Sequence, residues 1–199
     1  VAEQGDAVAQ LNIAVMYEYG KGVSQDYAQA VHWYNKAAEQ GQSEAQNRLG
    51  WMYENGKGIK QDYNQAITWY KKSAEQGETK ALLNLGIIYR KGKGIAEDYT
   101  QSFYWYKKVA DLGDASAQLN LGLMYEYGKG VDEDFTKAVY WYKKAAEQGD
   151  TKAQLILAVM FRYGTGVTED FTQAVYWYKK AAEQGDTKAQ LSLAEMYAS

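Results

Sequence analysis

The chain has 199 residues, a formal net charge of −3 and a sequence pI near 5.3. A balance without clustered positive charge does not suit sequence-independent binding of nucleic acid or of an acidic membrane surface. The absence of cysteine and the single histidine, His32, exclude disulfides, thiolate chemistry and the usual zinc ligand sets within these residues. We therefore expect no cofactor and no metal site. No stretch approaches the ~18 apolar residues of a membrane-spanning helix, so we expect no membrane insertion.

A 36-residue period organises the whole sequence. Tryptophans recur at this spacing, at Trp33, Trp69, Trp105, Trp141 and Trp177. Such a period is typical of a solenoid, in which similar helical units stack and each contacts only its neighbours. We expect one solenoid domain over residues 1–199, with repeats at 6–41, 42–77, 78–113, 114–149 and 150–185. Residues 1–5 match the end of a repeat, and residues 186–199 match the first half of another. We therefore interpret the chain as a piece of a longer protein.

Each repeat is predicted to contain two helices. In the first copy, Asp6 suits a helix N-cap and the first helix should run to about Tyr19. The glycines of the Gly20–Val23 loop should end it, because glycine adopts the left-handed C-cap without strain. The second helix should begin near Asp26, which forms a capping-box-like pair with the glutamine three residues later.

One position of the first helix is always small. Its occupants are Ala14, Gly50, Gly86, Gly122, Ala158 and Ala194. Glycine inside a helix costs roughly 0.5 to 1 kcal/mol relative to alanine. Its recurrence predicts a close helix crossing at this position, with no room for a larger side chain.

The second helix carries a broad stripe of apolar and aromatic residues that a single helix pair cannot cover. Stability should therefore come mainly from the contacts between neighbouring repeats. The two ends of the chain should expose apolar surface, around Val1 and Ala2 and on the final helix at Leu191, Leu193 and Met196. We expect weak end-to-end self-association through these ends at high concentration.

The repeat resembles the Sel-1-like repeat (SLR) family, which is related to tetratricopeptide repeats. The resemblance rests on Leu121-Gly122, Tyr125, the Gly128–Val131 loop, and Ala138, Trp141, Tyr142, Lys144, Ala145, Ala146 and Gly149 in the fourth copy. It implies an all-α, right-handed superhelical solenoid of antiparallel helix pairs, about five and a half repeats long, with the first helices lining a concave surface. It also implies an adaptor or scaffold that binds proteins. Many members are bacterial and exported, so the resemblance favours a periplasmic or secreted location.

Residues that are identical in every copy are best explained by packing. Eighteen consecutive residues, Ala138 to Leu155, recur unchanged at Ala174 to Leu191, which indicates recent duplication or consensus design. Function should instead lie where the copies differ. The first helices differ most at the positions of residues 8, 12, 15 and 19, which form a second face beside the buried one.

This variable face combines a central apolar row with asparagines and tyrosines, which suits a partner peptide. The predicted partner-binding residues are Arg48, Trp51, Asn55, Lys80, Asn84, Ile87, Lys91, Asn120, Leu123, Tyr127, Ile156, Val159 and Tyr163. Trp51 lies outside the 36-residue series and, with Arg48, is of a type enriched in binding hot spots; it could also simply pack. Lys80, Asn84 and Asn120 resemble the clamp by which peptide-binding tetratricopeptide domains hold a terminal carboxylate, although asparagine there is also plain repeat consensus.

We therefore expect a non-enzymatic scaffold that binds a protein or peptide on its concave first-helix face. One alternative is a structural spacer without a dedicated partner. A hydrolase, proposed for cysteine-rich relatives, is disfavoured by the lack of cysteine, the lone histidine and the absence of a paired set of carboxylates. The glycine-lysine-glycine loops lack the order of a phosphate-binding loop. Tyr104, Tyr140 and Tyr176 on the second helices are interpreted as packing edges, or as a second contact patch.

Overall fold

The computed structural model of the protein describes residues 5–198, which contain eleven helices and no strand. They form two compact units, one ending at Asp98 and the other beginning at Tyr99. The first unit contains α1 (Ala7–Tyr19), α2 (Tyr27–Glu39), α3 (Ser43–Asn55), α4 (Tyr63–Glu75) and α5 (Thr79–Lys91). The second unit contains α6 (Tyr99–Asp111), α7 (Ala115–Glu126), α8 (Phe135–Glu147), α9 (Thr151–Tyr163), α10 (Phe171–Glu183) and α11 (Thr187–Ala198).

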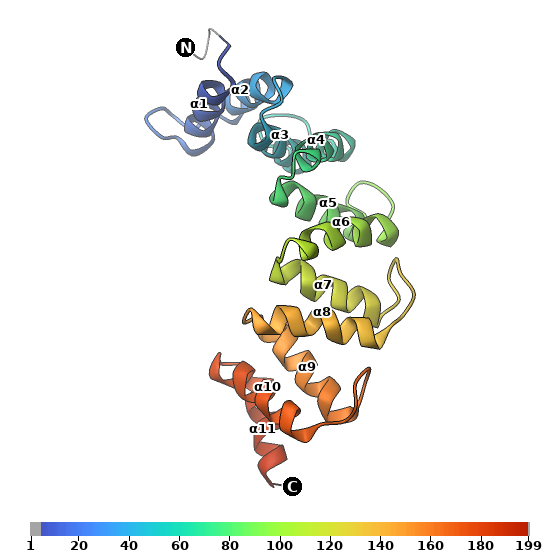
Figure 1. Ribbon diagram of the computed structural model, residues 1–199. Helices are drawn as coiled ribbons and strands as arrows, with labels where there is room; N and C mark the ends of the chain where they lie inside the picture. Colours follow the sequence, from blue (N-terminus) through green and yellow to red (C-terminus); the bar gives the residue numbers. More distant parts are fainter. Residues whose placement is uncertain (1–4, 199) are drawn as a thin grey trace. The chain divides into compact units, whose positions relative to one another are not determined.

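Within each unit every helix packs against the next one in the chain, and successive helices run in opposite directions (Figure 1). The predicted all-α architecture of repeated helix pairs is confirmed. None of the described helices has the length and apolar character needed to cross a membrane.

The predicted helix ends are also confirmed. The Asp6 carboxylate accepts hydrogen bonds from the first turn of α1, and Asp26 does the same for Ala28 and Gln29 at the start of α2. Gly20 closes α1 in the left-handed conformation, with φ of 67°. Short acceptor side chains and glycine thus define the limits of α1 and the start of α2, as expected from their capping chemistry.

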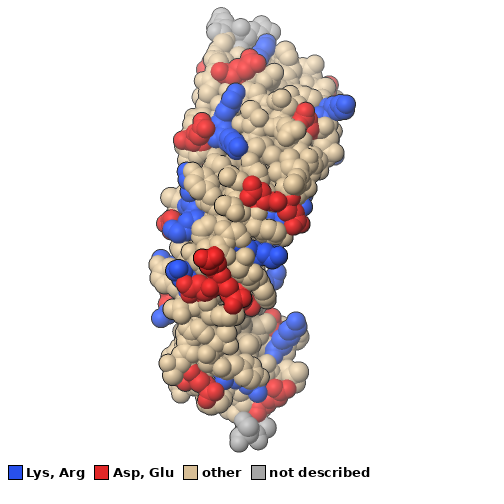
Figure 2. All heavy atoms as spheres, turned by 90° about the vertical axis from the view of Figure 1, so that its right-hand side faces the viewer, with Lys and Arg blue, Asp and Glu red and all other residues tan. Residues whose placement is uncertain are grey.

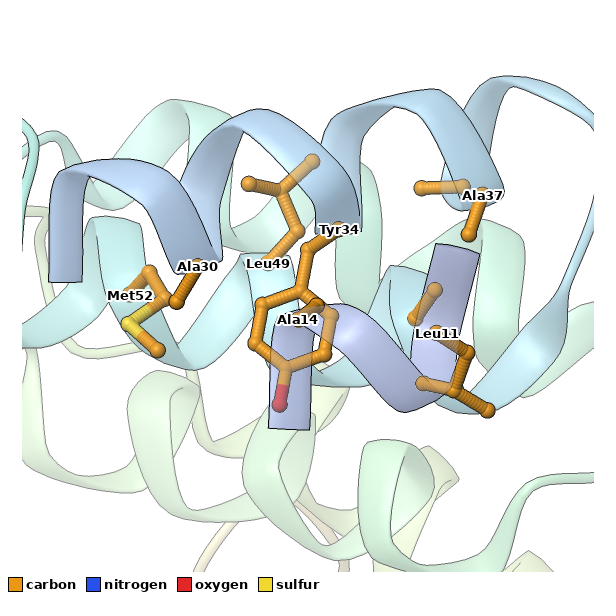
Figure 3. Close-up of a cluster of buried hydrophobic side chains, with 9 residues drawn as sticks. Leu11, Ala14, Ala30, Tyr34, Ala37, Leu49 and Met52 are labelled. Carbon is orange, nitrogen blue, oxygen red and sulfur yellow. The ribbon is translucent and has the colours of Figure 1, made fainter. Parts of the chain in front are cut away.

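The core of a repeat is built around one buried tyrosine of the second helix. In the first copy, Tyr34 points from α2 toward Ala14 of α1 and is fully buried (Figure 3). Leu49 and Met52 of the following α3 belong to the same cluster. The cluster therefore joins one repeat to the next, as the uncovered aromatic stripe predicted.

The small position of the first helix is the place where this tyrosine crosses it. A Cβ atom added to Gly50 would lie 2.8 Å from the ring of Tyr70, and one added to Gly122 would lie 2.4 Å from the ring of Tyr142. Both separations are too short for carbon atoms. The predicted close crossing is confirmed at these two positions.

The second glycine of each loop has a role that capping alone does not explain. A Cβ at Gly58 would lie 2.2 Å from the Tyr27 carbonyl oxygen, and one at Gly130 would lie 2.1 Å from that of Tyr99. At Gly22 the nearest such atom is the terminal methyl of Met16, at 3.5 Å. The second loop glycine of a repeat therefore packs against the start of the second helix of the preceding repeat. Gly22 has no such contact, because no second helix precedes it among the described residues.

Glutamines connect neighbouring repeats inside both units. Gln46 donates to the Ala38 carbonyl oxygen at 3.0 Å and accepts from Gln76 at 2.8 Å. Gln154 in the second unit makes the corresponding bonds with Ala146 and Gln184. Buried polar groups need such partners, so these glutamines serve the packing of the repeats.

The terminal helices show what a missing neighbour does. Met16 of α1 is 39% exposed, whereas its equivalent Met52 is fully buried. On α11, Leu191 is 64% exposed, and Leu193 and Met196 are partly exposed. Val1 and Ala2 lie outside the described residues. Self-association through the ends stays a prediction.

Candidate functional site

A cleft of about 630 Å³ opens on the first helices of the first unit. Its walls come from α1, α3 and α5, from the start of α2, and from the segments that precede α2 and α5. It is lined by Glu18, Tyr19, Gln25, Tyr27, Glu44, Asn47, Arg48, Trp51, Glu78, Lys80 and Asn84. The structure thus brings together four of the predicted partner-binding residues, namely Arg48, Trp51, Lys80 and Asn84.

Arg48 is held in the wall of the cleft by other residues of the chain. Its Nη1 lies 3.3 Å from both carboxylate oxygens of Glu18 and donates to the Tyr19 hydroxyl oxygen at 2.7 Å. Its Nη2 contacts Glu44 at 3.3 Å. The Glu18 side chain is only 7% exposed. The guanidinium group therefore neutralises a buried carboxylate, and it is a fixed part of the site rather than a free anchor.

Replacing Arg48 with alanine should lower the free energy of unfolding by about 2 kcal/mol, because Glu18 would stay buried without its cation. Replacing Glu44 with alanine removes only a more exposed pair within one helix, which contributes roughly 0.3 to 0.5 kcal/mol. Urea denaturation of both variants measures the difference. Equal stability of the two variants would show that Arg48 has no structural role.

Trp51 offers an accessible aromatic surface in the cleft, with 37% of the residue exposed, and Tyr19 offers another, with 52% exposed. Asn84 donates a hydrogen bond to Asn47 at 3.3 Å, and each amide keeps further hydrogen-bonding capacity for a ligand. Asn47 was missed by sequence reasoning. The sequence does contain a signal for it, because the equivalent position holds leucine in the five other copies, at Leu11, Leu83, Leu119, Leu155 and Leu191.

The charges of the cleft are mixed, with a small acidic excess. Glu18, Glu44 and Glu78 face Arg48 and Lys80 in its lining. Arg48 is paired with Glu18 and Glu44. Lys80 is therefore the positive side chain of the lining that forms no ion pair among the described residues. Figure 2 shows one face of the molecule, where acidic and basic side chains both lie in small groups among uncharged ones.

The other predicted residues of the first unit lie outside the lining of this cleft. Asn55 is exposed at the end of α3 and donates to the Trp51 carbonyl oxygen of its own helix at 2.9 Å. Ile87 is half-buried, and Lys91 is exposed at the end of α5.

In the second unit the predicted residues lie on the first helices α7 and α9, apart from Tyr127, which directly follows the last residue of α7. Tyr127 and Tyr163 are 61% and 64% exposed, and Val159 is 39% exposed. Leu123 and Ile156 are half-buried. Asn120, the remaining predicted residue of this unit, donates to the Ser116 carbonyl oxygen of its own helix at 2.7 Å.

A row of carboxylates beneath this face was also missed. The buried tyrosine of three repeats donates its hydroxyl to a glutamate of the first helix: Tyr34 to Glu18, Tyr70 to Glu54 and Tyr142 to Glu126. Burial raises the pKa of all three tyrosines well above the ordinary value near 10, and the adjacent carboxylates raise it further. The sequence signal is that this position of the first helix holds a charged residue in all five full repeats, while the tyrosine of the second helix is invariant: Glu18, Glu54, Arg90, Glu126 and Arg162.

The tyrosines of the second helices form a separate surface. Tyr104, Tyr140 and Tyr176 are each about half exposed and pack edge-on against the neighbouring tryptophan. A lysine four residues later lies over each ring, at 4.8 to 5.9 Å from its centroid. His32 is exposed at the equivalent position of α2. Within residues 5–198, no group of three or more histidine, aspartate or glutamate side chains is placed to hold a metal ion.

Comparison with known proteins identifies these repeats. The family model of the Sel1 repeat matches residues 7–42, 43–78, 79–114, 115–150 and 151–186. A protective antigen of uropathogenic Escherichia coli strains, which displays an SLR fold, is 41% identical with a TM-score of 0.92 over 98% of this chain. A Sel1 repeat protein of Oxalobacter formigenes is 39% identical with a TM-score of 0.87 over 98% of this chain and 80% of its own length.

A third relative is cysteine rich protein B of Helicobacter pylori, 30% identical with a TM-score of 0.51 over 65% of this chain and 92% of its own. The chain spans 42% of the length of the Escherichia coli antigen. A comparison with curated proteins gives no match.

Proposed function

Since this chain belongs to the Sel1 repeat family, whose fold generally serves as a non-catalytic scaffold for protein interactions, we propose that it binds a protein or peptide segment on its first-helix face. The observation that carries the proposal is the cleft of the first unit, where side chains that vary between the repeats line one hollow of about 630 Å³. A structural spacer would have no need for such a site.

The chemistry of the cleft fits a polypeptide segment. Trp51 supplies an exposed aromatic surface of the type enriched in binding hot spots. Asn47 and Asn84 supply amide groups that can bond to a peptide backbone. Lys80 supplies an exposed positive charge at the edge of the cleft. These groups suit an uncharged or mixed-charge segment with one apolar anchor.

A clamp for a terminal carboxylate is less well supported. Lys80 and Asn84 share the cleft, but Glu18, Glu44 and Glu78 line it as well. Arg48 is paired with Glu18 and Glu44, so its charge is not available to a ligand. A carboxylate would therefore meet more negative than free positive charge.

We extend the proposal to the second unit, where Tyr127 at the end of α7 and Val159 and Tyr163 of α9 are exposed. Tyrosine offers a rigid apolar ring with a hydroxyl that can form hydrogen bonds, which favours it in binding surfaces. The remaining predicted residues would border a segment bound to their own unit, namely Asn55, Ile87 and Lys91 in the first unit and Asn120, Leu123 and Ile156 in the second.

A peptide-display selection on the intact chain, followed by affinity measurements, tests this function. The variant with Trp51→Ala, Lys80→Ala and Asn84→Ala should lose at least ~30-fold in affinity for the selected peptides, since one hot-spot residue contributes about 2 kcal/mol. The matched control has Tyr104→Ala, Tyr140→Ala and Tyr176→Ala on the second helices and should bind like the parent. Circular dichroism checks that both variants fold.

Two results would overturn the proposal. If no peptide is enriched above background, the spacer is the better description. If the peptides lose affinity only in the control variant, the binding surface is the row of tyrosines on the second helices.

A further inference from the structure

We propose that Glu126 and Tyr127 in the second unit form a receptor for the guanidinium group of an arginine from the bound partner. This inference rests on the proposed function in one respect, namely that the partner is a polypeptide. The geometry of the site is inferred separately, from a comparison of the repeat that contains Glu18 with the repeat that contains Glu126.

The first unit shows the same pair of residues with an arginine in place. Arg48 Nη1 lies 3.3 Å from both oxygens of Glu18 and 2.7 Å from the hydroxyl of Tyr19, and its guanidinium carbon lies 5.8 Å from the Tyr19 ring centroid. On the other side, Tyr34 donates to the Glu18 carboxylate. The carboxylate and the tyrosine ring thus receive one guanidinium group.

The second unit repeats every acceptor of this arrangement. Glu126, Tyr127 and Tyr142 stand where Glu18, Tyr19 and Tyr34 stand, 108 residues later in the chain. Tyr142 donates to Glu126 as Tyr34 does to Glu18. Tyr127 directly follows Glu126, as Tyr19 follows Glu18, and hydrogen bonding to Glu126 raises the pKa of the Tyr127 hydroxyl.

The arginine is missing from the second unit. The residue equivalent to Arg48 is Ile156. The first unit shows a second way to neutralise such a glutamate, because Lys93 lies 2.9 Å from Glu54. The residue related to Glu126 as Lys93 is to Glu54 is Thr165. Both positions that supply a cation in the first unit are therefore uncharged around Glu126.

As a result, Glu126 takes part in none of the ion pairs formed among residues 5–198. It is half-buried, and Tyr127 beside it is 61% exposed. A partly desolvated carboxylate without a cation gains more from an incoming positive group than an exposed one does. The accessible tyrosine ring adds a face on which a guanidinium group can stack.

Arginine fits this site better than lysine or a metal ion. Its planar guanidinium can donate to the carboxylate and the phenol oxygen together while it lies near the ring, as Arg48 does. A single carboxylate cannot hold a divalent cation, which requires several oxygen ligands. Lys152, exposed on α9, stands where Glu44 supports Arg48. This like charge should weaken the site, which provides a further test.

Titration with Nα-acetyl-arginine amide, followed by NMR chemical shifts, tests the proposal on the intact chain. We expect saturable shifts centred on Glu126, Tyr127 and Ile156, with a Kd on the order of 1 mM for so small a ligand. The matched probe is Nα-acetyl-citrulline amide, which has the same shape without the charge and should cause no saturable change there.

Three variants separate the site from nonspecific attraction. Ile156→Arg should fill the site from within, as Arg48 does, and abolish the response, whereas the control Ile156→Leu should keep it. Glu126→Gln should also abolish the response. Lys152→Glu, which reproduces the surroundings of Arg48, should lower the Kd several-fold.

Equal responses to the arginine and citrulline probes would overturn the proposal. So would a response that survives in folded Ile156→Arg and Glu126→Gln variants, or shifts spread evenly over all acidic residues. These results would leave peptide binding in the first-unit cleft untouched. Conversely, if no peptide binds the first-unit cleft, the response of Glu126 and Tyr127 to the arginine probe should be unchanged. Each proposal can therefore fail without the other.

Discussion

Replacing Gly58 with alanine should destabilise the first unit by about 3 kcal/mol. Gly58 has φ of +69°, where an L-amino acid is strained by roughly 1 to 2 kcal/mol. In addition, the new Cβ would lie 2.2 Å from the Tyr27 carbonyl oxygen, and relieving such overpacking costs typically 1 to 3 kcal/mol. Urea denaturation followed by circular dichroism gives the change in the free energy of unfolding.

Gly22 provides the matched control, because it has φ of +76° at the same place in its loop and meets only the Met16 methyl group, at 3.5 Å. Gly22→Ala should cost only the backbone strain, roughly 1 to 2 kcal/mol. If both variants lose the same stability, Gly58 is required only for the positive φ of its loop, and the loop does not press on the preceding repeat.

Stability should fall steeply above pH 10. Tyr34 and Tyr70 are fully buried in the first unit and keep their protons in the folded state, since burial and then the hydrogen-bonded or neighbouring glutamate raise their pKa. In the unfolded chain they lose these protons near pH 10. Below that pH both states hold the protons and the contribution to stability is complete. Above it, each tyrosine lowers the free energy of unfolding by about 1.4 kcal/mol per pH unit.

Denaturation curves between pH 8 and pH 12 measure this slope, and Tyr70→Phe isolates one proton. The variant loses the hydrogen bond to Glu54, worth about 1 kcal/mol at pH 8. Above pH 10 its slope should be shallower by about 1.4 kcal/mol per pH unit. An unchanged slope in the variant would mean that Tyr70 ionises while the chain is folded.

Most of the fold could be predicted because repeated packing leaves a repeated pattern. Asp26 and Gly20 define helix ends by local chemistry, and both positions are as expected. Gly50 signalled a close crossing, although not that the ring of Tyr70 is what lies against it. The second role of Gly58 was missed because the helix start that it touches lies about one repeat earlier in the chain.

The candidate site was less predictable, since it depends on side-chain pairs between repeats. The residue type of Arg48 suggested a binding anchor, but Glu18 lies 30 residues earlier, where no helical periodicity links the two. Asn47 occupies a position that holds leucine in the other repeats. The periodicity therefore assigned this position to the packed face of the helix and not to the binding face. Variation between repeats and residue type predicted Trp51, Lys80 and Asn84 as binding residues, and they do line one cleft.

An NMR chemical-shift map of the chain, recorded with and without a peptide selected by display, tests the proposed binding surface most directly. We expect the largest changes at Asn47, Trp51, Lys80 and Asn84 on α3 and α5, and none at Tyr104, Tyr140 or Tyr176 on the second helices. Changes confined to those tyrosines, with the cleft unaffected, would contradict the assignment of binding to the first-helix face.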